Sequence, residues 1–373
     1  MKNKTLVIIT TFITIVISYF SYFSYTYINL KDIPEQYFKT KKKLDFHKKY
    51  SKSLHHIRDE VGLNFSDKET KATDLLFTNI NQIDNEKFTV LLQGDSWIDQ
   101  ISYPPYKSYE SREIVKNFGN KKKIKFINAG ISSFSPTLMN LQLNILENQF
   151  KIYPDVLVAY IDQTDIGDEN CRYRENKIKK KDKLVAVKPE KYSNHLWDYS
   201  RIYGLSEIYL NYNSKLLRTF HIINFNFQYG INKQVQKFFK NKKKNKCYYR
   251  EIENYLISPE KQSIEYFSNA LESYLKNIEN KTHIKKVFLV TFPHKKHFLK
   301  TEERGFYKLN VSNLVDEIIK NRKKIKHINF SKELKLDNNS DFKEIWGKDT
   351  IHLNSESHSN IFVKNILLHL ENF

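Results

Sequence analysis

The sequence is poor in cysteine and in arginine, and each shortage excludes a class of protein. Two Cys among 373 residues are too few for a disulfide framework or a Cys-rich zinc site. A formal net charge of +20 would suit a nucleic-acid partner. However, Arg supplies only nine of the 62 basic residues, and Arg is the side chain that best makes bidentate contacts with phosphate. We therefore expect no nucleic acid as a partner.

The chain is nevertheless long and apolar enough to fold around a large core. A length of 373 residues corresponds to one large domain or two ordinary ones. Hydrophobic residues make up 40% of the chain and aromatic residues 14%, which excludes disorder throughout. We find no internal repeat.

The longest apolar run lies at the N-terminus, from Thr5 to Tyr27, with no charged residue between Lys4 and Lys31. About 20 such residues span a bilayer as a helix. A short basic flank precedes the run and no small-x-small cleavage site follows it. We therefore expect residues 1–30 to form an uncleaved transmembrane signal-anchor, with the rest of the chain on the extracytoplasmic side. A cleaved signal peptide is the alternative, and the lysines that follow the run weaken the assignment of its orientation.

The remainder divides by composition into a stalk and a domain. Residues 31–86 are polar and Lys-rich with a helical pattern, for example at Thr73–Ile80, and predict a juxtamembrane helical stalk. Residues 87–373 alternate short apolar runs with longer amphipathic ones, which is typical of a parallel sheet covered by helices. The expected strands are 88–92, 124–127, 155–161, 286–291 and 327–330. The expected helices are 138–150, 264–278, 311–319 and 361–370. This pattern predicts an α/β fold with a doubly wound parallel sheet of five strands.

A long interruption at about 170–262 separates the third strand from the fourth. It is far longer than a simple crossover needs, so we expect a large, mostly helical insertion. Its two basic runs, 177–183 and 240–246, are most simply solvated loops, although contact with anionic lipid or acidic glycan would also suit them. Cys171 and Cys247 bracket the insertion, and whether they pair stays open here.

Chemistry-bearing residues follow the strands, where open α/β sheets bind ligands. Ser96 comes after the first strand and Gly130 after the second, while Thr164 follows the third and His352 precedes the last helix. A serine nucleophile needs a base, and the base needs an orienting carboxylate, which Asp349 could supply to His352. Backbone N–H groups at Ser96 and Gly130, with the Thr164 hydroxyl, would then form an oxyanion hole.

Gly94-Asp95-Ser96, the lone Gly130, the segment 162–165 and the Asp349-x-x-His352 motif together resemble the SGNH (GDSL-like) hydrolase superfamily. The resemblance implies Ser96 as nucleophile, His352 as base with Asp349 as its partner, and Ser96 and Gly130 as oxyanion donors. The family carries Asn where this chain has Thr164. Because a hydroxyl is shorter than an amide and can rotate away, this departure predicts slow or altered activity.

Together with the N-terminal apolar segment, the resemblance predicts a membrane-anchored serine esterase that removes acyl groups, above all acetyl, from a cell-surface glycan or a small ester. An O-acyltransferase on an envelope polysaccharide and a catalytically silent glycan-binding domain are the alternatives. Asp165, Arg172 and His294 are further candidates for substrate contacts. The competing interpretations are a salt bridge from Arg172 to Asp168 or Glu169, and a structural or exposed position for His294. The acidic stretch 162–169 would otherwise supply loop carboxylates and helix caps. We expect neither a cofactor nor a metal.

Overall fold

The computed structural model describes residues 2–30, 76–81, 88–102, 110–187, 204–205, 207–240, 247, 249–298, 306–334, 345–347 and 351–371. The chain forms two compact units. Unit 1 contains Met1–Phe46, Glu60–Thr70 and Lys191–Lys246, and unit 2 contains His47–Asp59, Lys71–Glu190 and Cys247–Phe373.

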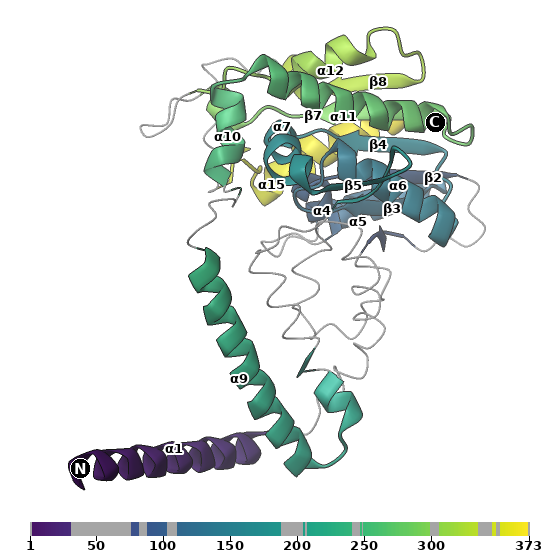
Figure 1. Cartoon of the computed structure of the whole chain (residues 1–373). Coiled ribbons are helices and arrows are strands. Elements are labelled where there is room, and N and C mark those ends of the chain that lie inside the picture. Colours follow the sequence, from purple (N-terminus) through teal and green to yellow (C-terminus); the bar gives the residue numbers. More distant parts are fainter. Residues whose placement is uncertain are drawn as a thin grey trace. The chain divides into compact units, whose positions relative to one another are not determined.

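Unit 2 is built on a six-stranded sheet with the strand order β1-β3-β2-β4-β7-β8 (Figure 1). The strands are β1 (Thr78–Asn79), β2 (Thr89–Gly94), β3 (Lys125–Gly130), β4 (Val156–Tyr160), β7 (Lys286–Thr291) and β8 (Ile325–Asn329). All pairs are parallel except β1 with β3. The five parallel strands are those predicted, and their order is that of a flavodoxin-like sheet. Its switch point lies between β2 and β4, where the chain winds from one face to the other.

Helices cover both faces of this sheet. They are α4 (Ser96–Ser102), α5 (Glu110–Lys122), α6 (Pro136–Phe150), α7 (Asp165–Gly167), α11 (Lys261–Glu279), α12 (Val311–Ile319), α13 (Phe330–Glu333), α15 (Ser355–Ser357), the π-helical turn η5 (His358–Val363) and α16 (Lys364–Leu370). The α6 and α11 helices pack together, with the Asn277 amide donating to Asn140 at 2.6 Å. The α5 helix packs against η5 and α16. The four predicted helices are thus confirmed, the last one as η5 and α16.

Strands β2 and β4 are buried on both faces, which explains why they read as continuous apolar runs rather than as alternating ones. One core cluster joins these strands to the helices that follow Ser96 and precede the C-terminus. Trp97 stands at its centre with no exposed surface. Its ring lies 5.1 Å from that of Tyr160, 5.2 Å from Phe292 and 5.2 Å from Phe362, centroid to centroid. The residue next to Ser96 is therefore fixed by aromatic packing.

The predicted helix at Thr73–Ile80 is wrong in its described part, because residues 78–79 form the edge strand β1. The Asn81 side chain explains the difference: its amide donates to the Ile124 carbonyl at 2.7 Å, and its oxygen accepts from the Phe126 N–H at 2.8 Å. These bonds draw the segment along β3. Most of the predicted stalk, 31–86, lies outside the described residues.

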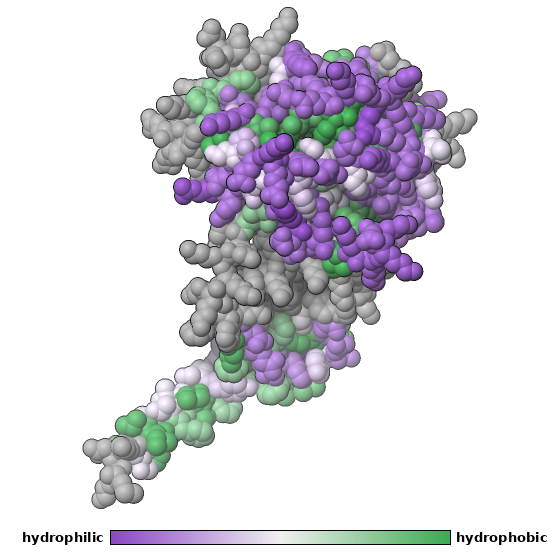
Figure 2. Space-filling model, turned by 45° about the horizontal axis from the view of Figure 1, so that its top comes forward, coloured by the Kyte–Doolittle hydropathy of each residue, from purple (hydrophilic) through white to green (hydrophobic). Residues whose placement is uncertain are grey.

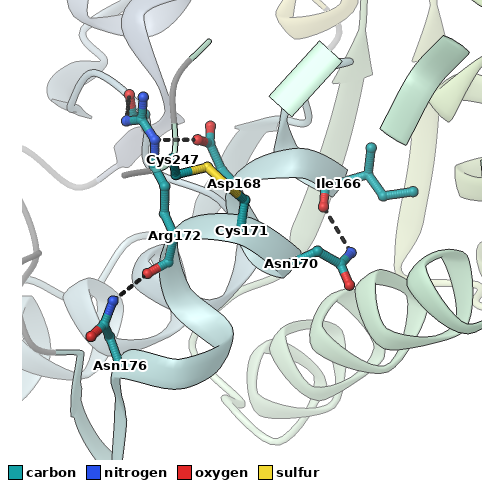
Figure 3. The surroundings of a disulfide bond; sticks show 8 residues. Ile166, Asp168, Asn170, Cys171, Arg172, Asn176 and Cys247 are labelled. Carbon is teal, nitrogen blue, oxygen red and sulfur yellow. Dashed lines mark hydrogen bonds and ion pairs between the residues drawn. A yellow bond between two sulfur atoms is a disulfide. The ribbon is translucent and has the colours of Figure 1, made fainter. Parts of the chain in front are cut away.

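The insertion is partly helical. Its described elements are the π-helical turn η2 (Asp168–Tyr173), the short turn η3 (Arg174–Asn176), strands β5 (Lys177–Lys180) and β6 (Lys183–Val187), and helices α9 (Lys215–Lys240) and α10 (Tyr249–Ile257). The basic run predicted as a loop is a hairpin, turning through Lys181 and Asp182 at positive φ. Cys171 and Cys247 form a disulfide with a Cα–Cα distance of 5.7 Å (Figure 3).

Unit 1 contains helix α1 (Lys2–Asn29). Residues Thr5–Asn29 of this helix are long and apolar enough to cross a membrane, a test that a signal sequence near the N-terminus also passes. Figure 2 shows the apolar side chains along this helix at the lower left. The structure therefore agrees with the predicted span and is compatible with both an anchor and a signal peptide.

Candidate active site

Ser96 and His352, which are 256 residues apart in sequence, meet at the carboxyl end of the sheet. The Ser96 Oγ lies 2.7 Å from the His352 Nε2. Both residues are half-buried, so the pair is held by the protein and still reached by solvent. Ser96 follows β2 at the switch point of the sheet, where ligands bind in folds of this kind. The structure thus brings together the predicted nucleophile and base.

The turn from β2 into α4 fixes the position of Ser96. Gly94 has φ +155°, and a Cβ there would lie 2.9 Å from the Cβ of Tyr160, so only glycine fits. The Asp95 carboxylate accepts from the Trp97 N–H at 2.9 Å. Ser96 therefore stands at the first position of α4, where a backbone N–H has no partner within the helix.

A short antiparallel pairing carries His352. The Gly347 N–H donates to the His352 carbonyl at 2.7 Å, and the Asn354 N–H donates to the Ile345 carbonyl at 2.9 Å. The His352 ring also packs on Trp97 at a centroid distance of 6.1 Å. Asp349, the predicted orienting carboxylate, lies outside the described residues.

His358 is a further histidine of this site, and its importance was not predicted. Its Nε2 lies 2.9 Å from the Trp97 carbonyl and its Nδ1 lies 2.9 Å from the Ser111 Oγ. Because a carbonyl only accepts, Nε2 carries the proton and Nδ1 accepts from Ser111. Burial lowers the pKa of His358 to about 4, which keeps the ring neutral. His358 thus ties the C-terminal helices to the residue beside Ser96. Its only sequence signal is its position six residues after His352.

Two of the three predicted oxyanion donors are engaged elsewhere. The Gly130 N–H, predicted to be free, donates to the Asn128 Oδ1 at 2.8 Å. The Thr164 hydroxyl donates to the Asp162 Oδ2 at 2.5 Å, and a hydroxyl has only one proton to donate. Gly130 is instead needed for packing, since a Cβ there would collide with the backbone of α4. Ser96 is the predicted donor whose position still suits the role.

Asp162 and His294 form a pair buried in the protein. The His294 Nε2 lies 2.8 Å from the Asp162 Oδ1, and each side chain is 1% exposed. Tyr160 also donates to this carboxylate, at 3.0 Å. Burial alone would raise the pKa of Asp162, but the charge and hydrogen bond of His294, with the bonds from Thr164, hold it well below its usual range. His294 was a candidate for a substrate contact, with a structural role as the alternative, and its burial favours the structural role, as a brace for the loop after β4.

Asp165 was also predicted to contact substrate, and it is fully buried. Its Oδ2 accepts from the Asp162 N–H at 3.1 Å. Burial and the nearby charges of Asp95 and Asp162 raise its pKa well above the usual range. The pKa of Asp95 is raised by burial and by Asp162 in the same way. Asp95 and Asp165 are therefore both interior groups.

Arg172 makes the predicted ion pair, with 3.0 Å between its Nε and the Asp168 Oδ1 (Figure 3). It also donates to the Ser133 Oγ at 2.8 Å. Glu169 accepts from the Thr137 N–H at 2.7 Å and thereby caps α6. The acidic stretch is therefore buried and internally paired rather than solvated. Within the described ranges, no group of three or more His, Cys, Asp or Glu could hold a metal ion.

The sequence matches no protein-family model and no curated protein. The structure is similar to an acetyl xylan esterase at 13% identity and a TM-score of 0.40, covering 76% of this chain and 100% of that one. It is similar to an acetylxylan esterase from Geobacillus stearothermophilus at 13% identity and a TM-score of 0.38, covering 77% and 95%. A GDSL-like lipase from Bacteroides thetaiotaomicron matches at 13% identity and a TM-score of 0.35, covering 78% and 91%. At these values, function has to be argued from the site itself.

Proposed function

We propose that the chain is a serine esterase of the SGNH type that acts through an acyl-serine intermediate. The observation that carries the proposal is the 2.7 Å contact between the Ser96 Oγ and the His352 Nε2, in a half-buried pair at the switch point of a parallel sheet. A hydroxyl that close to a neutral imidazole can lose its proton to it as the oxygen attacks.

In the proposed reaction, the Ser96 Oγ attacks the ester carbonyl carbon while His352 Nε2 takes the hydroxyl proton. The Ser96 N–H stabilises the oxyanion that forms. The bond to the alcohol then breaks, and His352 returns the proton to the departing oxygen. Water repeats the sequence on the acyl-serine and releases the acid. Asp349 holds His352 in the tautomer that this exchange requires.

We propose acyl groups of a cell-surface glycan, acetyl above all, as the substrate. The proposal follows from the N-terminal apolar helix, which would hold the domain at the outer side of a membrane, where such glycans occur. An O-acyltransferase would use the same acyl-serine and differ only in the acceptor that reaches it. Adding an oligosaccharide acceptor separates the two, because a transferase then releases acylated glycan and a hydrolase releases free acid.

A fluorophosphonate probe tests the proposal, since it labels only serines activated by a base. We expect the probe to label the wild type and to fail on Ser96→Ala. Ser132→Ala is the matched control, because Ser132 is exposed and lies in the loop after β3. Labelling that survives in Ser96→Ala would assign the reactivity to another residue.

A catalytically silent glycan-binding domain is the second candidate. It is favoured by the engagement of the Gly130 N–H by Asn128 and of the Thr164 hydroxyl by Asp162, which leaves the predicted oxyanion hole with fewer donors. This candidate predicts no probe labelling, together with glycan binding that is equal in the wild type and in Ser96→Ala.

A further inference from the structure

Helix α9 belongs to the longest stretch of the chain that has no acidic residue. Between Glu207 and Glu251 there is no acidic residue. The basic residues in this interval are Lys215, Arg218, Lys233, Lys237, Lys240, Lys242, Lys243, Lys244, Lys246 and Arg250. A segment of this charge attracts anionic partners and repels a second copy of itself.

The same helix exposes an apolar stripe. Its members follow at spacings of four and seven residues and therefore lie on one helical face. They are Leu216 (56% exposed), Phe220 (48%), Phe227 (67%), Ile231 (47%) and Val235 (45%). Soluble proteins seldom leave a continuous aromatic and aliphatic surface open to water. We therefore expect the stripe to contact an apolar environment in the cell.

The flank of α9 that adjoins the stripe is packed. Thr219 is fully buried, and Ile222 and Ile223 are 7% and 5% exposed. The Arg218 guanidinium lies 5.7 Å from the Tyr209 ring centroid. By helical spacing, Lys215, Arg218 and Lys233 lie on the half of the helix away from the stripe. Such a helix, with an apolar face and a basic face, is typical of one that lies in a membrane interface.

The start of α9 lies beside the end of α1, within the same unit (Figure 1). The Lys215 Nζ is 5.0 Å from the ring centroid of Tyr27, two residues before α1 ends at Asn29. Tyr27 belongs to the aromatic end of the apolar span, where tyrosine commonly marks the membrane–water boundary. The contact therefore brings α9 to the depth at which α1 leaves the bilayer.

We propose that α9 lies in the interface of a bilayer that contains anionic lipid, with its apolar stripe among the acyl chains and its basic residues near the headgroups. Each Lys or Arg near an anionic surface adds to the attraction. The proposal rests on α1 as the membrane anchor and is independent of the esterase proposal. It gives the chain a second membrane contact, from the insertion, beside the N-terminal helix.

Spin labels on the full chain in vesicles of phosphatidylcholine and phosphatidylglycerol test this proposal. The native cysteines are bonded to each other, so a label goes to one introduced cysteine. Phe227→Cys reports on the stripe, and Asn232→Cys is the matched control on an exposed polar position of the same helix. Phe12→Cys, 67% exposed in α1, reports independently on the anchor.

The measured quantity is the relaxation of each label by oxygen divided by its relaxation by a water-soluble nickel chelate. We expect this ratio to be several-fold higher for Phe227→Cys than for Asn232→Cys. The Phe12→Cys label should lie deep in the bilayer. In vesicles of phosphatidylcholine alone, which carry no net charge, the ratio of oxygen to chelate relaxation at Phe227→Cys should be lower. Access of the chelate to Phe227→Cys, while Phe12→Cys stays in lipid, would overturn the α9 proposal and leave the anchor. A Phe227→Cys label shielded from both reagents would mean a protein contact and would also overturn it. Exposure of both labels to the chelate would overturn the anchor as well.

Discussion

Two histidines flank Trp97, and they differ in almost every property that decides what a histidine can do. The ring centroid of His352 lies 6.1 Å from that of Trp97, and that of His294 lies 6.4 Å away. His352 is half-buried and bonds to a hydroxyl, whereas His294 is buried and bonds to the Asp162 carboxylate. The His352 pair can exchange a proton with a reacting group, while the His294 pair has no access to one. The two residues are of the same type, so their different burial and hydrogen-bond partners decide that His352 can react and that His294 supports the structure.

Loss of the base should have the largest effect. We expect His352→Gln to lower kcat by about 10³–10⁴-fold while the unfolding temperature stays close to that of the wild type. The measurement is p-nitrophenyl acetate turnover beside thermal unfolding by circular dichroism. Full activity in this variant would remove His352 from the mechanism.

Loss of His294, the partner of Asp162, should lower stability rather than activity. His294→Leu leaves the buried Asp162 carboxylate without its His294 partner, and we expect a loss of about 3–5 kcal/mol in the free energy of unfolding. Adding Asp162→Asn should restore part of that loss, since no charge is then buried. Activity per folded molecule should stay within about tenfold of the wild type. A stable but inactive His294→Leu would place His294 among the reacting groups.

The disulfide, like the Asp162–His294 pair, should contribute to stability rather than to the reaction. Cys171 is next to Arg172, which forms an ion pair with Asp168 (Figure 3). We expect the double variant Cys171→Ser with Cys247→Ser to lose about 2–4 kcal/mol of stability. A reducing agent should lower the unfolding temperature of the wild type to that of the double variant. The unfolding temperature of the double variant should not change. Equal stability of the two proteins in oxidising buffer would refute this role.

The raised pKa of Asp165 gives a pH-dependent prediction. The folded chain holds this proton when the unfolded chain has released it, so Asp165 costs stability as the pH rises above about 4. Asp165→Asn keeps an acceptor for the Asp162 N–H and removes the charge. We expect it to match the wild type at low pH and to be about 1 kcal/mol more stable at neutral pH. Urea unfolding across pH measures the difference, and a gain that is largest in acid would contradict the sign.

Thr164 should give the smallest effect. Removing a true oxyanion donor costs about 10²–10³ in rate, but this hydroxyl already donates to Asp162. We therefore expect Thr164→Ser to keep wild-type kcat and Thr164→Val to lose less than about tenfold. A loss of 10²-fold or more in a folded Thr164→Val would restore the hydroxyl to the oxyanion hole.

The sequence was sufficient for the parallel strands and for the Ser96–His352 pair, because both follow from patterns with a fixed physical meaning. Continuous apolar runs mark strands buried on both faces, and residues after parallel strands converge at one edge. The helices that cover the sheet have clear helical periodicity as well.

Two of the missed features depend on the hydrogen bonds of one side chain. β1 has two residues and is set by Asn81, and the engagement of the Gly130 N–H depends on the Asn128 amide. The hairpin turns through Lys181 and Asp182 without the Asn-Gly signal of such turns. The burial of His294 follows from how the core closes around Trp97, which no spacing along the chain reveals.

The acyl-enzyme tests the central claim most directly. The full chain would be mixed with p-nitrophenyl acetate, quenched in acid, digested and analysed by mass spectrometry, beside Ser96→Ala. We predict an acetyl group on Ser96, with a burst of p-nitrophenolate of about one per chain if deacylation is slow, and neither in the variant. Turnover without acetyl on Ser96, or turnover that persists in Ser96→Ala, would contradict a serine esterase built on the Ser96–His352 pair.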